Sequence, residues 1–245
     1  MKLSEMLEYT AGQYLDDRTA IVDGDPDSLW SDEFLVRQFN EAERKLARRA
    51  WVIIEEGVPP AGTITLATGK AVYDLHKSIL RVYCATPADQ DWPLYRTSDM
   101  RLRLPRPFED IPFDLNNASV TATGRPLAIA TDAGTRQMRV FRTPTSTENG
   151  LILNLKVARL PISPLSLEDV DAEPEVPEDY HELLCRYAAG RALVLPNVDG
   201  QFRTIGRELL QGFDEEVLEA RQDRQRAEME PARWGFASST AFLGS

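Results

Sequence analysis

The sequence lacks most features that mark an enzyme or a metal protein. It contains no G-x-S-x-G, Walker, G-x-G-x-x-G, H-E-x-x-H or C-x-x-C motif, the spacings that position common nucleophiles, phosphate-binding loops and metal ligands. The chain has only two histidines, His76 and His181, and two cysteines, Cys84 and Cys185. This excludes a His-rich metal site, and the cysteines, far apart in apolar surroundings, are expected to be core thiols. We therefore predict no cofactor, no metal and no catalytic residue.

Long apolar stretches are absent too. No run of 18 apolar residues occurs, and the opening MKLSEML lacks the apolar centre of a signal peptide. With 42% hydrophobic and 27% charged residues in 245, the composition is that of a globular protein. We expect a soluble protein without a membrane partner, which stays in the compartment where it is made.

Positive charge is scarce at both ends of the sequence. The net charge of −11 divides into −6 for residues 1–60, +4 for residues 61–160 and −9 for residues 161–245. Tight DNA binding requires several Lys and Arg side chains that neutralise phosphates. The acidic parts are therefore poor DNA-binding candidates, and the protein is expected to stand beside nucleic acid without gripping it.

Apolar periodicity predicts helices near both ends of the chain. Residues 3–17 form a short helical pattern, and a stronger helix begins after the N-cap Ser31 and is expected to end at Gly57. A third helix is predicted from Pro177, and a last one follows Gly200. The apolar stripe expected on the last helix consists of Phe202, Ile205, Leu209, Phe213 and Val217.

The period changes to two between Thr63 and Pro161, where β-branched and aromatic residues alternate between turn signals. Within it, residues 86–118 are Pro-rich and are expected to form a long loop, with YRTSDMRLRL as one possible strand. The fold class predicted is α+β: a helical bundle from both ends of the chain with an inserted antiparallel β-rich domain and an extended C-terminal tail. The boundaries predicted are helical 1–60 and 166–230, β-rich 61–165, and tail 231–245.

Two charge clusters allow more than one interpretation. Eight acids lie between Glu168 and Glu182 without a Lys or Arg, which is typical of a solvated linker. A basic cluster on the second helix is expected either to pair within the chain, with Glu41, Glu55 or the acidic C-terminal third, or to contact another subunit. Its members are Arg44, Lys45, Arg48 and Arg49. His181 is expected at a helix surface or an interface, and His76 in a structural role.

Three segments resemble one known family. WSDEFLVRQFNEAERKLARRA (residues 30–50), TITLATGKAVYDLHKSILRV (residues 63–82) and VPEDYHELLCRYAAGRAL (residues 176–193) are similar, in the same order, to phage head-to-tail adaptors, the tail tubular A-type or head-completion proteins of short-tailed phages. The matches cover about a quarter of the chain, and residues 86–118 and those after Glu230 lie outside them.

The resemblance implies a non-enzymatic virion protein. It implies a ring homo-oligomer, usually twelvefold, in the neck of the phage between the portal protein and the tail nozzle or tube protein. DNA would pass transiently through its channel, tail fibres are a further expected partner, and the protein would be made in the host cytoplasm.

The C-terminal part is the predicted portal contact. The residues proposed for it are Arg221, Arg224, Arg226, Trp234, Phe236 and Phe242. Burial of the three aromatics does not offset the entropy of ordering about fifteen residues, so this contact is expected to form on assembly.

Two alternatives stay open at this point. One is a phage-associated cell-wall or glycan hydrolase, whose paired acids would come from Asp99, Glu109, Asp110 and Asp114. The other is a fibre or receptor-binding adaptor in which the β domain provides the affinity and the helices only oligomerise.

Overall fold

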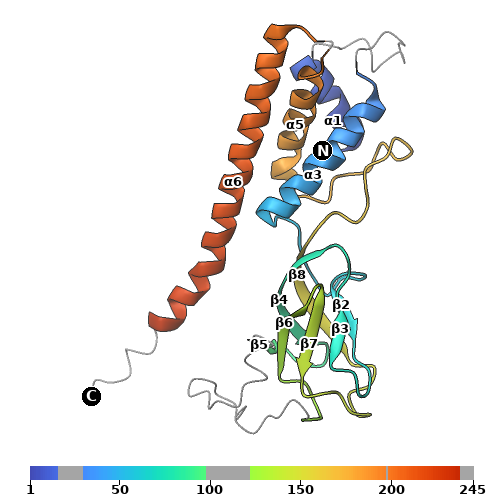
Figure 1. The fold of residues 1–245 in the computed structure, drawn as a ribbon, viewed down its shortest axis with the longest axis vertical. Helices are drawn as coiled ribbons and strands as arrows, with labels where there is room; N and C mark the ends of the chain where they lie inside the picture. Colours follow the sequence, from blue (N-terminus) through green and yellow to red (C-terminus); the bar gives the residue numbers. More distant parts are fainter. Residues whose placement is uncertain (16–29, 98–121, 197, 238–245) are drawn as a thin grey trace. The chain divides into compact units, whose positions relative to one another are not determined.

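The chain forms two compact units (Figure 1). The computed structural model describes residues 1–15, 30–97, 122–196 and 198–237, with side chains up to residue 228 in the last helix. Met1–Ile53 and Leu160–Ser245 form the helical unit, and Ile54–Arg159 form the β unit. The predicted α+β fold, with helices from both ends of the chain and a β-rich insert, is confirmed.

The helical unit is built around α5, which packs against α1, α3 and α6. α3 and α6 run in the same direction, and α5 runs against them (Figure 1). In the described ranges, no helix has the length and apolar character needed to cross a bilayer. The helices are α1 (Leu3–Thr10), the π-helix η1 (Ala11–Leu15), α3 (Asp32–Ala50), the 3-10 helix η3 (Glu178–Tyr180), α5 (His181–Leu193) and α6 (Gly200–Ala237).

The α3 helix begins as predicted and ends earlier than predicted. The Ser31 hydroxyl accepts a hydrogen bond from the Phe34 N–H at 3.3 Å, as an N-cap should. The helix stops at Ala50, because Trp51 takes a left-handed conformation with φ 56°. The expected end at Gly57 is wrong, since residues 54–56 pair with a strand of the β unit instead. Pairing within the sheet overrides the helical pattern there.

Polar side chains on α3 fasten the segment of residues 160–177, here called the strap. The Asn40 side chain makes two hydrogen bonds to the Leu165 backbone, at 2.8 and 2.9 Å. The buried carboxylate of Glu43 accepts hydrogen bonds from the Glu175 and Val176 N–H groups. The predicted solvated linker is therefore exposed along its acidic stretch but held at its backbone.

Glycines set the approach of α5 to α6. A Cβ on Gly206 would lie 2.8 Å from the Leu193 Cβ and 3.0 Å from the Gly190 carbonyl oxygen. The buried side of α6 therefore runs through Gly206, Phe213 and Val217. The stripe predicted from Phe202 and Ile205 is wrong at its start, because these side chains are 51% and 41% exposed.

The tail predicted to be extended over residues 231–245 begins as helix, because α6 continues to Ala237. Residues 219–230 are nearly all strong helix formers, and elongating a formed helix costs little. Residues 238–245 lie outside the described part of the chain.

In its described residues, the β unit contains two four-stranded sheets. In the first, β8 pairs with β4 and with both β1 and β2; the second has the order β3-β7-β6-β5. Leu66, Tyr73, Ile129, Met138 and Leu155 contribute to its buried core. The strands are β1 (Ile54–Glu56), β2 (Thr63–Thr65), β3 (Val72–Asp74), β4 (Ile79–Pro87), β5 (Tyr95–Thr97), β6 (Ala128–Gly134), β7 (Gln137–Phe141) and β8 (Ile152–Arg159).

One strand pair departs from the predicted antiparallel pattern. β5 and β6 are parallel, which the thirty residues that separate them in sequence permit, since parallel strands need a long crossover. Near the start of the described part after residue 121, a single parallel bridge joins Thr123 and Thr143.

Candidate interaction surface

Both histidines and Cys185 occupy structural positions, whereas Cys84 is only half-buried, so the expected core thiol is found at Cys185 and not at Cys84. His181 is 3% exposed; its ring nitrogens lie 2.8 Å from the Met1 α-amino group and 3.1 Å from the Val176 carbonyl oxygen, and burial lowers its pKa. The predicted surface or interface position of His181 is therefore wrong. The His76 ring bonds the Ser78 hydroxyl at 2.8 Å, and burial raises the pKa of Cys185 to about 12.

The acidic and metal-ligating side chains are a second set of candidates. No group of three or more His, Cys, Asp or Glu side chains there is placed to hold a metal ion. The four acids considered for a hydrolase, Asp99, Glu109, Asp110 and Asp114, lie outside the described part of the chain.

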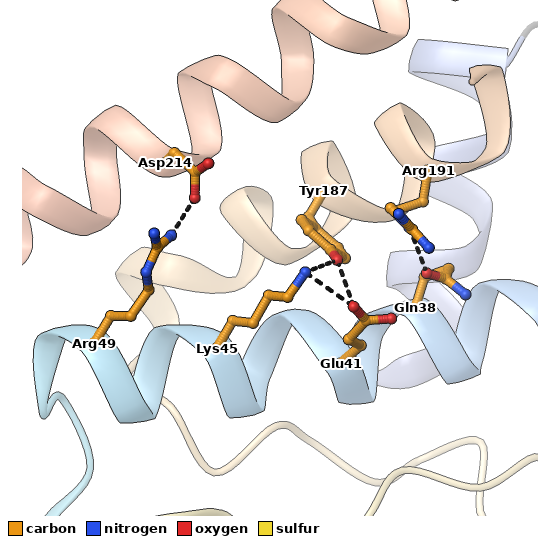
Figure 2. Close-up of polar contacts among 7 residues, drawn as sticks. All are labelled: Gln38, Glu41, Lys45, Arg49, Tyr187, Arg191 and Asp214. Atoms are coloured by element: carbon orange, nitrogen blue, oxygen red, sulfur yellow. Dashed lines mark hydrogen bonds and ion pairs between the residues drawn. The ribbon is translucent and has the colours of Figure 1, made fainter.

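The basic cluster of α3 divides into two pairs, of which the first faces the bundle (Figure 2). The Lys45 ammonium lies 2.9 Å from a Glu41 carboxylate oxygen and bonds the Tyr187 hydroxyl. Tyr187 donates in turn to Glu41 at 2.8 Å. Arg49 pairs with Asp214 of α6. Pairing within the chain, one of the two interpretations of the sequence, therefore describes Lys45 and Arg49.

The charge states of Glu41 and Lys45 support their role in joining α3 to α5. The hydrogen bond from Lys45 is the main cause that lowers the pKa of Glu41. Burial opposes the charge of Lys45, but its bonds to Tyr187 and Glu41 outweigh burial and raise its pKa. Both partners therefore stay charged near neutral pH and join α3 to α5.

Arg44 and Arg48 form the second pair and are exposed. Within the described ranges, neither makes a hydrogen bond or an ion pair. Both line a groove of about 930 Å³ between α3 and the strap. Arg37 lines the same groove about two helical turns before Arg44 and three before Arg48. The groove is lined by Glu33, Val36, Arg37, Asn40, Glu41, Arg44, Lys45, Arg48, Arg49, Pro164, Leu165, Ser166, Leu167 and Glu168.

The residues proposed for the portal contact are not seen as one surface. The Arg221 guanidinium lies 5.2 Å from the centre of the Trp51 ring, and Arg226 pairs with Asp223 at 3.1 Å. Arg224 is half-buried. Trp234 and Phe236 lie on the last turns of α6, where side chains are not described, and Phe242 lies outside the described residues.

An acidic face of α6 was missed by the sequence reasoning. Glu208, Glu215 and Glu219 are all exposed, whereas Asp214 and Glu216 pair with Arg49 and Arg186 inside the helical unit. The signal that could have found this face was the spacing of the three exposed acids, seven and then four residues apart.

The helical unit thus presents an exposed basic groove and an exposed acidic helix face. A search of curated proteins finds no match to this chain. A family model described as the SU10 adaptor protein matches residues 1–235, which cover the β unit and all but the last ten residues of the helical unit. The predicted resemblance to phage head-to-tail adaptors is confirmed. The chain belongs to the SU10 adaptor protein family and has the structural role of a phage adaptor.

Proposed function

We propose that the protein is a head-to-tail adaptor that forms a ring of twelve copies between the portal and the tail of a phage virion. The single observation that carries this proposal is the match of an adaptor family over residues 1–235. The ring, its stoichiometry and the passage of DNA through it come from the resemblance to head-to-tail adaptors.

The surfaces of the helical unit support a ring. A head-to-tail ring repeats one heterologous interface until it closes, so each copy needs two different, complementary faces. The exposed basic groove beside α3 and the acidic face of α6 are two such faces. Arg44 and Arg48 remain candidates for the subunit contact, while Lys45 and Arg49 would support it by holding α3 in place.

The charge of the protein suits a channel for DNA. With a net charge of −11, most of the surface gains little from counterion release on contact with phosphates. DNA would pass through without being held. In this function the protein carries no catalysis, and its site of action is the neck of the virion.

We assign the partners by region. The C-terminal part, with Arg221, Arg224, Arg226, Trp234, Phe236 and Phe242, would contact the portal protein, and the β unit would contact the tail nozzle or tube protein and the tail fibres. Deletion of residues 231–245 tests the first assignment. The truncated protein should keep the fold of both units and lose portal binding; unchanged portal binding would reject the assignment.

The function as a whole is tested by the mass of the purified 27.6 kDa protein, alone and mixed with purified portal protein. Native mass spectrometry should give a monomer for the protein alone, and a complex containing many copies when portal is present. A mixture with bovine serum albumin is the control. A protein that binds portal as a single copy, or not at all, contradicts the proposal.

A further inference from the structure

The free basic residues of α3 form a stripe with a defined spacing. Arg37, Arg44 and Arg48 stand at positions i, i+7 and i+11. At 100° per residue these positions lie within about 20° of one direction around the helix, over about 16 Å of its length. All three are exposed and line the groove. Arg37 stacks on the Phe34 ring at 5.4 Å, which leaves its charge accessible.

The exposed acids of α6 repeat that spacing. Glu208, Glu215 and Glu219 also stand at i, i+7 and i+11, so they form a stripe of the same length and direction. No Lys or Arg lies between Glu208 and Ala220. Glu215 accepts a hydrogen bond from Gln211 of the same helix at 2.8 Å, which leaves its charge available for a partner.

The two stripes of one chain do not meet. Phe213 and Val217 of α6 are buried in the bundle, and the acidic stripe lies on the other side of that helix. Asp214, which lies about 100° around the helix from Glu215, pairs with Arg49 of α3 (Figure 2). The arginine stripe and the acid stripe are therefore both accessible to another chain.

We propose that the α6 stripe of one copy docks into the α3 groove of the next copy, pairing Arg37 with Glu208, Arg44 with Glu215 and Arg48 with Glu219. This inference rests on the proposed ring. In a parallel arrangement the spacings of seven and four match at all three positions. In an antiparallel arrangement the central pair would be out of register by three residues, about 4.5 Å.

The direction of the helices favours the parallel arrangement. α3 and α6 run the same way within one helical unit (Figure 1). Rotation about a ring axis preserves the direction of each helix along that axis, so α6 of a neighbour also runs parallel to α3 if both follow the axis. Exposed apolar side chains flank both stripes: Leu218 on α6 is 53% exposed, and Leu167 in the groove wall is 38% exposed. Docking would cover both.

Charge reversal tests the pairing on the full-length protein. The variant Arg44→Glu/Arg48→Glu and the variant Glu215→Arg/Glu219→Arg should each keep the thermal unfolding of the wild type, since all four side chains are exposed. Each should form rings roughly tenfold to hundredfold more weakly, because exposed ion pairs are replaced by like charges. The matched control is Lys77→Glu/Arg96→Glu, two exposed bases of the β unit, which should form rings normally.

Two recombinations identify the partner. A chain that carries all four substitutions should form rings again, because every interface then has complementary charges in exchanged order. The two reversed variants mixed together should also form rings, with alternating copies. Ring mass is read by native mass spectrometry, with the portal protein present if the wild type requires it.

The outcomes separate this pairing from the function on which it rests. A wild type that forms no ring under any of these conditions overturns both. A wild-type ring that the Arg44→Glu/Arg48→Glu variant also forms at normal strength overturns the pairing and leaves the adaptor function in place. If that variant forms rings and loses only portal binding, the portal occupies the groove. If reversal is not rescued by the fourfold variant, α6 is not the occupant.

Discussion

The helical unit and the β unit are each stabilised in a different way. In the helical unit, polar side chains join residues far apart in sequence: the Trp30 indole N–H donates to the Ala192 carbonyl at 3.1 Å, and Glu43 accepts from the Glu175 backbone. The β unit is one continuous stretch of chain in which β8 organises a sheet from its neighbours. The bundle therefore depends on the meeting of two distant segments, and the insert does not.

Separating the chain at the unit boundaries should have the largest effect. Residues 54–159 expressed alone should fold, because their core is complete within that range. Residues 160–245 alone should lose essentially the whole stability of the helical unit, about 5–15 kcal/mol, because α5 packs on α1 and α3. Circular dichroism and urea titration measure both. Cooperative unfolding of fragment 160–245 would refute the comparison.

Removing a buried anchor of the strap should come next. Glu43→Ala leaves the backbone donors of Glu175 and Val176 without their acceptor in a buried site. The expected loss is about 3 kcal/mol, at roughly 1–3 kcal/mol for each unsatisfied donor. Urea unfolding measures it, with Glu33→Ala, an exposed acid in the first turn of the same helix, as the control that should lose no more than about 0.3–1 kcal/mol. If Glu43→Ala loses no more free energy of unfolding than the control, the strap does not depend on the Glu43 carboxylate.

A substitution at the close crossing of α5 and α6 should cost less stability, and a matched substitution elsewhere on α6 should increase stability. Gly206→Ala places a methyl group 2.8 Å from the Leu193 Cβ, so a loss of about 2 kcal/mol is expected from overpacking. Gly212→Ala, on the same helix with open space at its Cβ position, should stabilise by about 0.5–1 kcal/mol. Thermal unfolding of both variants checks this. Equal effects would mean that the crossing is looser than described.

Protonation of His181 should give the smallest effect. Burial lowers its pKa in the folded state below the usual value of 6.5, so the unfolded state binds the proton more readily. The stability that neutral His181 contributes is fully present above about pH 6.5 and is lost as the pH falls through its folded pKa. The urea midpoint should therefore fall further from pH 7.5 to pH 5.0 in the wild type than in His181→Gln. Identical drops would show that His181 does not titrate in this way.

Local signals predicted several elements of the fold correctly. Ser31 predicted the start of α3, and the change of period after Thr63 predicted the β-rich insert. These succeeded because capping and apolar alternation act over a few residues. The end of α3 and the buried side of early α6 failed, because sheet pairing at Ile54–Glu56 and backbone contact at Gly206 are tertiary effects.

The interaction surface was predicted only in part. The sequence placed Arg44, Lys45, Arg48 and Arg49 on α3, but a helix position gives a direction and no partner. Tyr187 and Asp214 take two of the four bases, since α5 and α6 pack on that side, and the groove beside the strap leaves the other two exposed. Arg37 and the acids of α6 could be identified as surface candidates only from their exposure in the structure.

The sequence by itself determined the α+β class, the division between acidic helical parts and a mildly basic insert, and the resemblance to adaptors that the family match confirms. It did so because periodicity, charge and motif order are properties of the chain. Only the tertiary structure decided which charged side chains pair within the bundle and which remain exposed on its surface. That choice depends on the side chains that packing brings within a few ångströms, and these come from opposite ends of the sequence.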